Sequence, residues 1–87
     1  MNKFDSVGDS EINARVHVAL GCKGDVVPEY CCDPSFSWPL IEKYRLNIYP
    51  SEGPDFMPWI AAKNAITVTD KHPLRAAMIL FLMLHDK

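Results

Sequence analysis

The most apolar stretch of the chain lies near its carboxyl end. From Ala76 to Leu84 every side chain is apolar. A helix with this pattern has no polar face at any rotation, so other parts of the chain must cover it on most sides. Pro73 suits the first helical position, because its φ is already near the helical value and its missing N–H would have no helical partner there. The pattern predicts a buried helix over residues 73–84. Its nine-residue apolar run is too short for a bilayer, which needs about 20 residues.

A second helix is predicted near the amino end, over residues 9–20. Its apolar positions recur at helical spacing and share one face, which we expect to lie on the core. They are Ile12, Val16, Ala19 and Leu20. Asp9 is an N-cap candidate, and Gly21 is placed to end the helix.

A third helix is predicted over residues 34–45, with Asp33 as N-cap and Pro34 in the first position. Its expected core face consists of Phe36, Leu40, Ile41 and Tyr44. Pro39 interrupts the pattern, because proline removes a helical hydrogen bond at a cost of about 3 kcal/mol. The helix either kinks at Pro39 or begins afresh with Ser37 as N-cap, and we favour the second.

Three short strands are predicted between the helix over residues 34–45 and the helix over residues 73–84. They cover residues 46–50, 56–62 and 65–69. In the third strand apolar and threonine positions alternate, which places Ile66 and Val68 inward. Pro58 suggests an edge position for the middle strand. Strands that follow one another through short turns form an antiparallel meander, so the predicted fold class is α+β, a sheet covered by helices.

Two segments have no sustained period. Residues 1–8 are expected to be a loose lead-in to a single domain over residues 9–87. Residues 22–32 contain turn-forming residues and are expected to form a loop. Its predicted anchors to the core are Val26, Val27 and Tyr30.

Charge and composition narrow the function classes. The 87 residues carry a net charge of -2, with nine basic and eleven acidic residues spread along the chain. They form no basic stripe that could follow a phosphate backbone, so nucleic-acid binding is not expected. The amino end lacks the apolar core of a signal peptide, and we expect a cytoplasmic protein without a membrane anchor.

The three cysteines are candidates for chemistry. Cys31 and Cys32 precede a predicted helix start, where the dipole can lower a thiol pKa, but no histidine is placed by sequence as a base. With Cys22 and His72 they make up a four-ligand set for zinc. The spacing lacks the paired C-x₂₋₄-C knuckles of structural zinc sites, so we expect no metal.

Aromatic side chains and one arginine are candidates for a protein interface. They are Trp38, Tyr44, Trp59 and Arg75. Aromatics are enriched at interfaces but also fill the core of small domains, and both interpretations stay open. Arg75 lies in a helix first turn, on the unfavourable side of the dipole, so we expect a tertiary partner such as Asp70 or Asp33.

Three parts of the chain also form a recognisable set. They are Ser10-Glu11-Ile12-Asn13 continuing through Val16 to Ala19-Leu20-Gly21, Tyr30-Cys31-Cys32-Asp33-Pro34 followed by Trp38-Pro39-Leu40-Ile41, and Pro73-Leu74-Arg75-Ala76-Ala77-Met78-Ile79 with Phe81-Leu82-Met83. Together they resemble a family of small bacteriophage and prophage proteins with the phage ABA-sandwich domain, often called NinX-like. The resemblance implies helix-sheet-helix layering, a phage or prophage origin and no established activity.

The expected function follows from what the sequence contains and lacks. It has no Gly-rich phosphate loop, recognisable carboxylate dyad or nucleophile elbow. We therefore expect a non-enzymatic accessory protein without a cofactor that acts through protein contacts, with another protein or with a second copy. The apolar helix over residues 73–84 is the basis, because 87 residues leave little to cover it. The alternative is a metal-binding or redox role at Cys31 and Cys32.

Overall fold

The computed structural model describes residues 7–21, 26–50 and 59–85. In chain order the elements are α1 (Asp9–Ala19), α2 (Pro34–Lys43), β1 (Asn47–Pro50), β2 (Trp59–Lys63), β3 (Ile66–Asp70) and α3 (Pro73–His85). All six predicted elements are present in the predicted order, which confirms the α+β fold class. The predicted strand residues 56–58 and the lead-in residues 1–6 lie outside the described residues.

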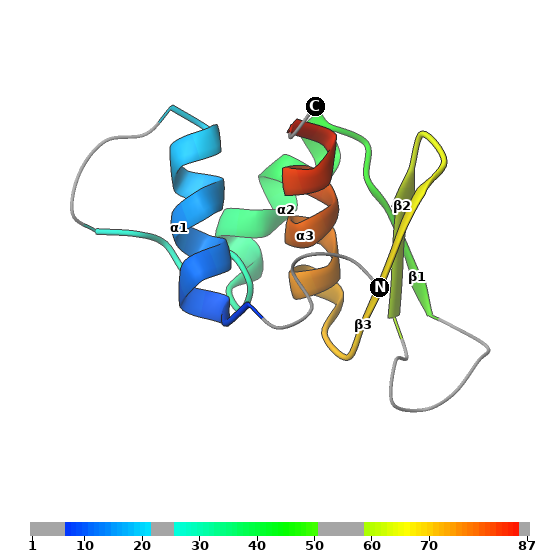
Figure 1. Ribbon diagram of the computed structural model, residues 1–87, viewed down its shortest axis with the longest axis horizontal. Coiled ribbons are helices and arrows are strands. Elements are labelled where there is room, and N and C mark those ends of the chain that lie inside the picture. Colours follow the sequence, from blue (N-terminus) through cyan, green and yellow to red (C-terminus); the bar gives the residue numbers. More distant parts are fainter. Residues whose placement is uncertain (1–6, 22–25, 51–58, 86–87) are drawn as a thin grey trace.

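Helix α3 is the centre of the molecule. Helices α1 and α2 lie on one side of it and the sheet lies on the other (Figure 1). Seven consecutive residues, Ala76–Leu82, are buried. The predicted buried helix is confirmed, but it leaves no large uncovered apolar face between Ala76 and Leu82. The reason given for a protein interface on this helix was therefore wrong, because α1, α2 and the sheet together surround it.

The sheet is an antiparallel meander in the order β1-β2-β3, as predicted. Ile48, Ala61 and Val68 pair across the three strands, and Ala61 and Val68 are fully buried against α3. Thr67 and Thr69 are exposed, as the alternation predicted. The edge position suggested for the middle strand was wrong: β2 is central, and it begins at Trp59, after Pro58.

All three helices lie on the same side of the sheet (Figure 1). A helix layer on the other side, which the family resemblance implies, is not found among residues 7–21, 26–50 and 59–85. None of the helices in this part of the chain is long and apolar enough to cross a membrane.

Helix α2 continues through Pro39 without a restart at Ser37. The favoured prediction of a new N-cap was therefore wrong. Pro39 cannot donate to the Ser35 carbonyl, but Ser35 is exposed, so water can satisfy that carbonyl at little cost. Ser37 is instead buried, and its hydroxyl donates to the Asp33 carbonyl at 3.3 Å.

The end of α2 differs from the predicted boundary at residue 45. Arg45 has φ 52, the left-handed conformation, and the helix stops at Lys43. The Leu46 N–H donates to the Ile41 carbonyl at 3.0 Å, and the Arg45 N–H donates to the Glu42 carbonyl at 3.3 Å. These two bonds form a Schellman motif, in which the residue after the cap is usually glycine. The buried side chain of Leu46 then leads the chain into β1.

Four predicted details are wrong at the level of single residues. The N-cap of α1 is Gly8, and Asp9 is the first helical residue. Ala19 is exposed, although Ile12 and Val16 on the same predicted face are buried. Val26 does not anchor its loop, because 85% of its surface is exposed, whereas Tyr30 is buried as predicted. Phe36 also lies outside the core.

Candidate functional site

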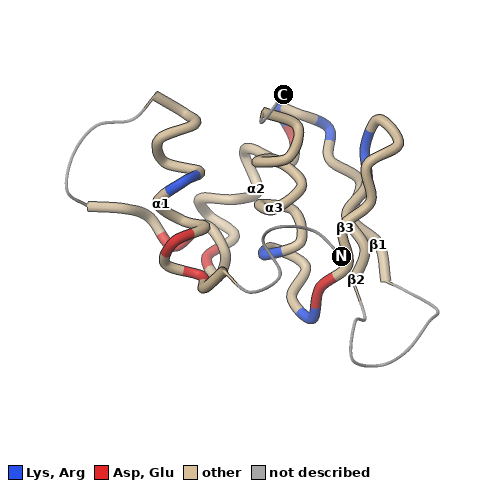
Figure 2. Tube along the Cα trace, in the orientation of Figure 1, with Lys and Arg blue, Asp and Glu red and all other residues tan. Residues whose placement is uncertain are grey.

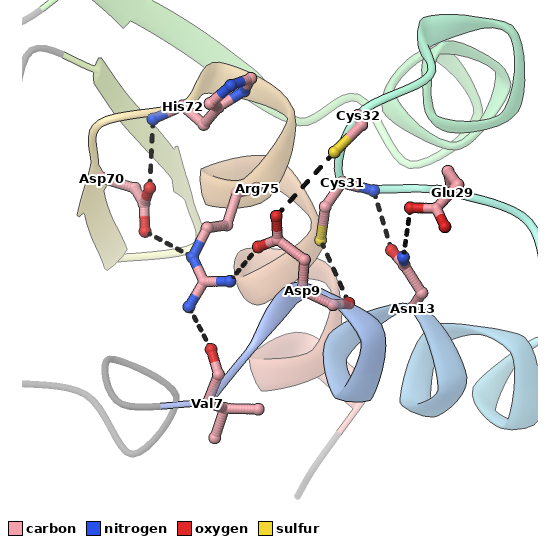
Figure 3. Close-up of polar contacts among 9 residues, drawn as sticks. All are labelled: Val7, Asp9, Asn13, Glu29, Cys31, Cys32, Asp70, His72 and Arg75. Carbon is pink, nitrogen blue, oxygen red and sulfur yellow. Dashed lines mark hydrogen bonds and ion pairs between the residues drawn. The ribbon is translucent and has the colours of Figure 1, made fainter.

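A buried hydrogen-bond relay joins the Cys31 segment to α1. The Cys31 N–H donates to the Asn13 side-chain oxygen at 2.9 Å, and the Asn13 amide donates to the Glu29 carboxylate at 3.2 Å (Figure 3). Asn13 and Cys31 are both buried. A buried backbone N–H without a partner is costly, so Asn13 fixes the path of this turn. Sequence reasoning missed Asn13, although a polar residue between Ile12 and Val16 on an apolar face was a visible signal.

The two adjacent thiols approach the same residue. The Cys31 sulfur lies 4.0 Å from the Asp9 carbonyl oxygen, and the Cys32 sulfur lies 3.9 Å from an Asp9 carboxylate oxygen (Figure 3). Burial, followed by the Asp9 charge, raises the pKa of Cys31 to about 12. Loss of solvation, again followed by the Asp9 charge, raises the pKa of Cys32. Both thiols are therefore protonated at neutral pH, whereas reactive cysteines have a lowered pKa.

Arg75 is the centre of a second polar cluster. Its Nε donates to an Asp70 carboxylate oxygen at 3.0 Å, while its two terminal nitrogens donate to the Asp9 carboxylate and the Val7 carbonyl (Figure 3). Only 14% of the Arg75 and Asp70 side chains is exposed. Burial alone lowers the pKa of Arg75, but its hydrogen bond to the Asp9 carboxylate and the charges of both aspartates raise that pKa overall. Arg75 therefore ties α1 and β3 to the start of α3.

The predicted partner Asp70 is confirmed, whereas Asp33 has a different role. Its carboxylate accepts hydrogen bonds from the Ser35 N–H at 3.0 Å and the Ser35 hydroxyl at 2.7 Å, which is the predicted N-cap of α2. All three helices begin at the same end of the molecule (Figure 1). Asp9, Asp33 and Asp70 lie at that end, where helix dipoles favour negative charge. Arg75 tolerates the unfavourable dipole there because two carboxylates pair with it.

The proposed zinc ligands are only partly described. Cys22 lies outside the described residues. In the part of the chain that the structure describes, no three His, Cys, Asp or Glu side chains are grouped so that they could hold a metal ion. His72 contributes its backbone N–H, which donates to Asp70 at 3.1 Å.

The four residues predicted as an interaction surface do not share one face. Tyr44 is half-buried, with its ring 5.2 Å from Phe81 and 5.4 Å from His85 between centroids. Trp59 is half-buried in β2, and Arg75 belongs to the ion-pair cluster. Trp38 differs, because 53% of its surface is exposed.

Phe36 joins Trp38 on the surface of α2, with 45% of its area exposed. Two residues are about 200° apart around an α-helix, so Phe36 and Trp38 emerge on the two flanks of the outward face. Ser35, Pro39 and Glu42 lie between them and are exposed. Tyr30 supports the Phe36 flank through an edge-to-face contact at 6.3 Å between ring centroids. We call this outward side of the helix, flanked by Phe36 and Trp38, the α2 face.

The three segments that carry the family resemblance meet in one place. Asn13, Cys31 and Arg75 come from the first, second and third segment, and Asp9 contacts both cysteines and Arg75. A family model described as bacteriophage P22 NinX matches residues 10–85. The chain belongs to this NinX family. No curated protein and no solved structure matched it.

In this member of the NinX family, residues from these three segments, together with Asp9 and Asp70, build a joint between helices. In the Asp9–Arg75–Asp70 cluster and in the Asn13–Cys31 relay, the polar groups pair with other residues of the same group. Both thiols stay protonated at neutral pH. Such an arrangement fixes the relative positions of α1, α3 and the Cys31 turn. The candidate surface for contact with other molecules is therefore the α2 face.

Proposed function

We propose that this phage protein is a non-enzymatic accessory factor that works by protein–protein contact through the α2 face. The exposure of Trp38 carries the proposal. Tryptophan is the residue type most often found as a binding hot spot, and exposing its large ring to water is unfavourable. In this chain the buried core is filled without Trp38, so its position is not required for packing.

The structure of α2 suits a binding surface. Among the described elements α2 packs mainly against α3, through the side that bears Leu40 and Ile41. The opposite side is free of the ion pairs found among the described residues at the other helix starts. Its backbone is held by the Asp33 cap at one end and the Schellman motif at the other. A rigid helix loses little conformational entropy when a partner binds.

The alternative role at Cys31 and Cys32 has less support. Thiol catalysis and metal binding both require thiolates, and the raised pKa values of both cysteines disfavour them. Alkylation kinetics at neutral pH test this alternative. Labelling of Cys32 faster than a small free thiol would revive it.

Site-specific photo-crosslinking tests the proposed function. A benzophenone amino acid is placed at Trp38 in protein produced in phage-infected cells, and a matched control places it at Val18, which is 73% exposed on α1. We expect a discrete covalent adduct from position 38 and none from position 18. Mass spectrometry then identifies the captured chain. Equal labelling at both positions, or none at position 38, would contradict a binding role for the α2 face.

A further inference from the structure

The charges around the α2 face are divided between its two ends. Glu29 and Asp33 lie at the start, and Glu42, Lys43 and Arg45 lie at the end, so the start is acidic and the end has a net positive charge. Figure 2 shows acidic residues in the segment that leads into α2 and basic residues at the other end of the helix. Hydrogen bonds from Ser35 lower the pKa of Asp33, so the start of α2 keeps a negative charge. The Lys43 ammonium lies 5.5 Å from the centroid of the Tyr44 ring, at the other end.

This division is self-complementary. The midpoint of α2 lies between Trp38 and Pro39, so a second α2 that runs antiparallel about that point places its end beside the start of the first. Lys43 of each copy then lies opposite Asp33 of the other. The two helix dipoles also oppose each other, which is favourable.

The aromatic flanks match under the same symmetry. Consider a two-fold axis that lies in the contact plane and is perpendicular to α2. It places the Trp38 flanks of both copies on one side of the contact and the Phe36 flanks of both copies on the other side. Trp38 therefore meets Trp38 of the second copy close to the axis, and the two Phe36 rings lie on the other side. Glu42 faces the neutral Ser35 of the second copy, so its charge is not opposed by a like charge.

Resting on the proposed function, we infer that the occupant of the α2 face is a second copy of this chain, docked α2 to α2 about a two-fold axis. A closed two-fold contact uses the same surface on both copies, which is the commonest form of homo-oligomer. Helix α2 has 10 residues and is about 15 Å long. It provides less than the ~800 Å² per partner of a stable interface, so the dimer dissociates on dilution.

Sedimentation equilibrium of the full chain tests this inference, over a range from about 10 μM to 1 mM that covers weak association. The wild type should change from monomer to dimer within this range. Trp38→Ala should weaken the association at least tenfold, as loss of a central aromatic anchor does. Lys43→Glu should weaken it several-fold and should reverse the effect of added salt, because the variant places two carboxylates opposite each other and salt screens their repulsion. Lys71→Glu, an equal charge change at an exposed position between β3 and α3, should leave the association unchanged.

Circular dichroism and urea titration first establish that each variant is folded. A wild-type protein that stays monomeric at 1 mM, or a dimer that Trp38→Ala and Lys43→Glu do not weaken, overturns the inference. A monomer that still crosslinks from position 38 to a different protein leaves the proposed function intact and replaces its partner. A self-adduct from position 38, together with dimers that Lys43→Glu weakens, supports both.

Discussion

Helices α2 and α3 are both rich in apolar residues, but the fold treats them differently. Seven consecutive residues of α3 are buried, because α1, α2 and the sheet surround it. Helix α2 packs on α3 through one side and leaves Trp38 and Phe36 in water. The comparison teaches that apolar content decides whether a helix is buried only when apolar residues occupy all sides of the helix. Where the apolar residues lie on several sides of a helix that packs mainly against one neighbour, some of them remain exposed and available for contact.

The largest expected effect is the loss of stability when a cavity is made in α3, compared with truncation of an exposed side chain in α2. Leu80→Ala should lower the free energy of unfolding by about 3–4 kcal/mol, since Leu80 is fully buried in α3. Trp38→Ala on α2 removes a larger side chain but should cost less than about 1 kcal/mol. Urea unfolding followed by circular dichroism measures both. Equal losses in the two variants would mean that α2 and α3 are buried alike.

The next largest effect on stability concerns Arg75, a charged residue in the otherwise apolar helix α3. Arg75→Met should cost about 2–3 kcal/mol, because Asp70, with a side chain only 14% exposed, is left without its guanidinium partner. The control Arg15→Met breaks the ion pair with Glu11, whose side chains are about half exposed, and should cost less than about 0.5 kcal/mol. The same urea titration applies. A small loss for Arg75→Met would show that the joint between α1, β3 and α3 contributes little.

The pH dependence of stability should distinguish the buried Cys31 thiol from the exposed Cys32 thiol, both of which lie just before α2. The folded-state pKa of Cys31, about 12, lies above its ordinary value of 9.0, so the folded protein holds this proton more tightly than the unfolded chain. The corresponding stability is present below pH 9 and is lost as pH rises toward 12. Wild type should therefore lose about 1 kcal/mol more than Cys31→Val between pH 9 and 10. Cys32→Ser is the control, and a wild-type slope equal to that of Cys31→Val would contradict the burial of this thiol.

The smallest effect lies at the turn between β2 and β3. Asn64 and Ala65 have φ values of 51 and 68, the left-handed pair of a type I′ hairpin turn. Alanine is strained there, so Ala65→Gly should raise the free energy of unfolding by about 0.5–1 kcal/mol. Ala62→Gly, within β2, should lower it by a similar amount. Thermal unfolding measures both, and destabilisation by Ala65→Gly would contradict the turn geometry.

Much of the architecture could be predicted from local patterns. Apolar spacing located the three helices, and the Asp33–Pro34 pair marked the start of α2 correctly. The alternation in residues 66–69 gave the inward and outward sides of β3. These features depend on periodicity and on side chains that act within a few residues of themselves. The course of α2 through Pro39 was missed, because the cost of a lost hydrogen bond depends on whether water reaches the Ser35 carbonyl.

The candidate site could be predicted only in part. Asp70 was named as a partner of Arg75, because the two residues are close in the chain. Asp9 was interpreted as a cap, and its ion pair with Arg75, 66 residues away, was not foreseen. Trp38 was a candidate interface residue beside three others that the fold places elsewhere. A list of aromatic residues does not show which of them the neighbouring elements will cover.

The sequence by itself determined that residues 73–84 form a helix that must be surrounded, because a helix without a polar side has no stable place in water. It also determined the order of the helices and strands along the chain. Only the tertiary structure decided which apolar residues of α2 stay in solvent, which carboxylates meet Arg75 and how the Cys31 thiol is sheltered. Those outcomes depend on contacts between segments far apart in the chain, and the energy of such contacts is set by the relative placement of whole elements.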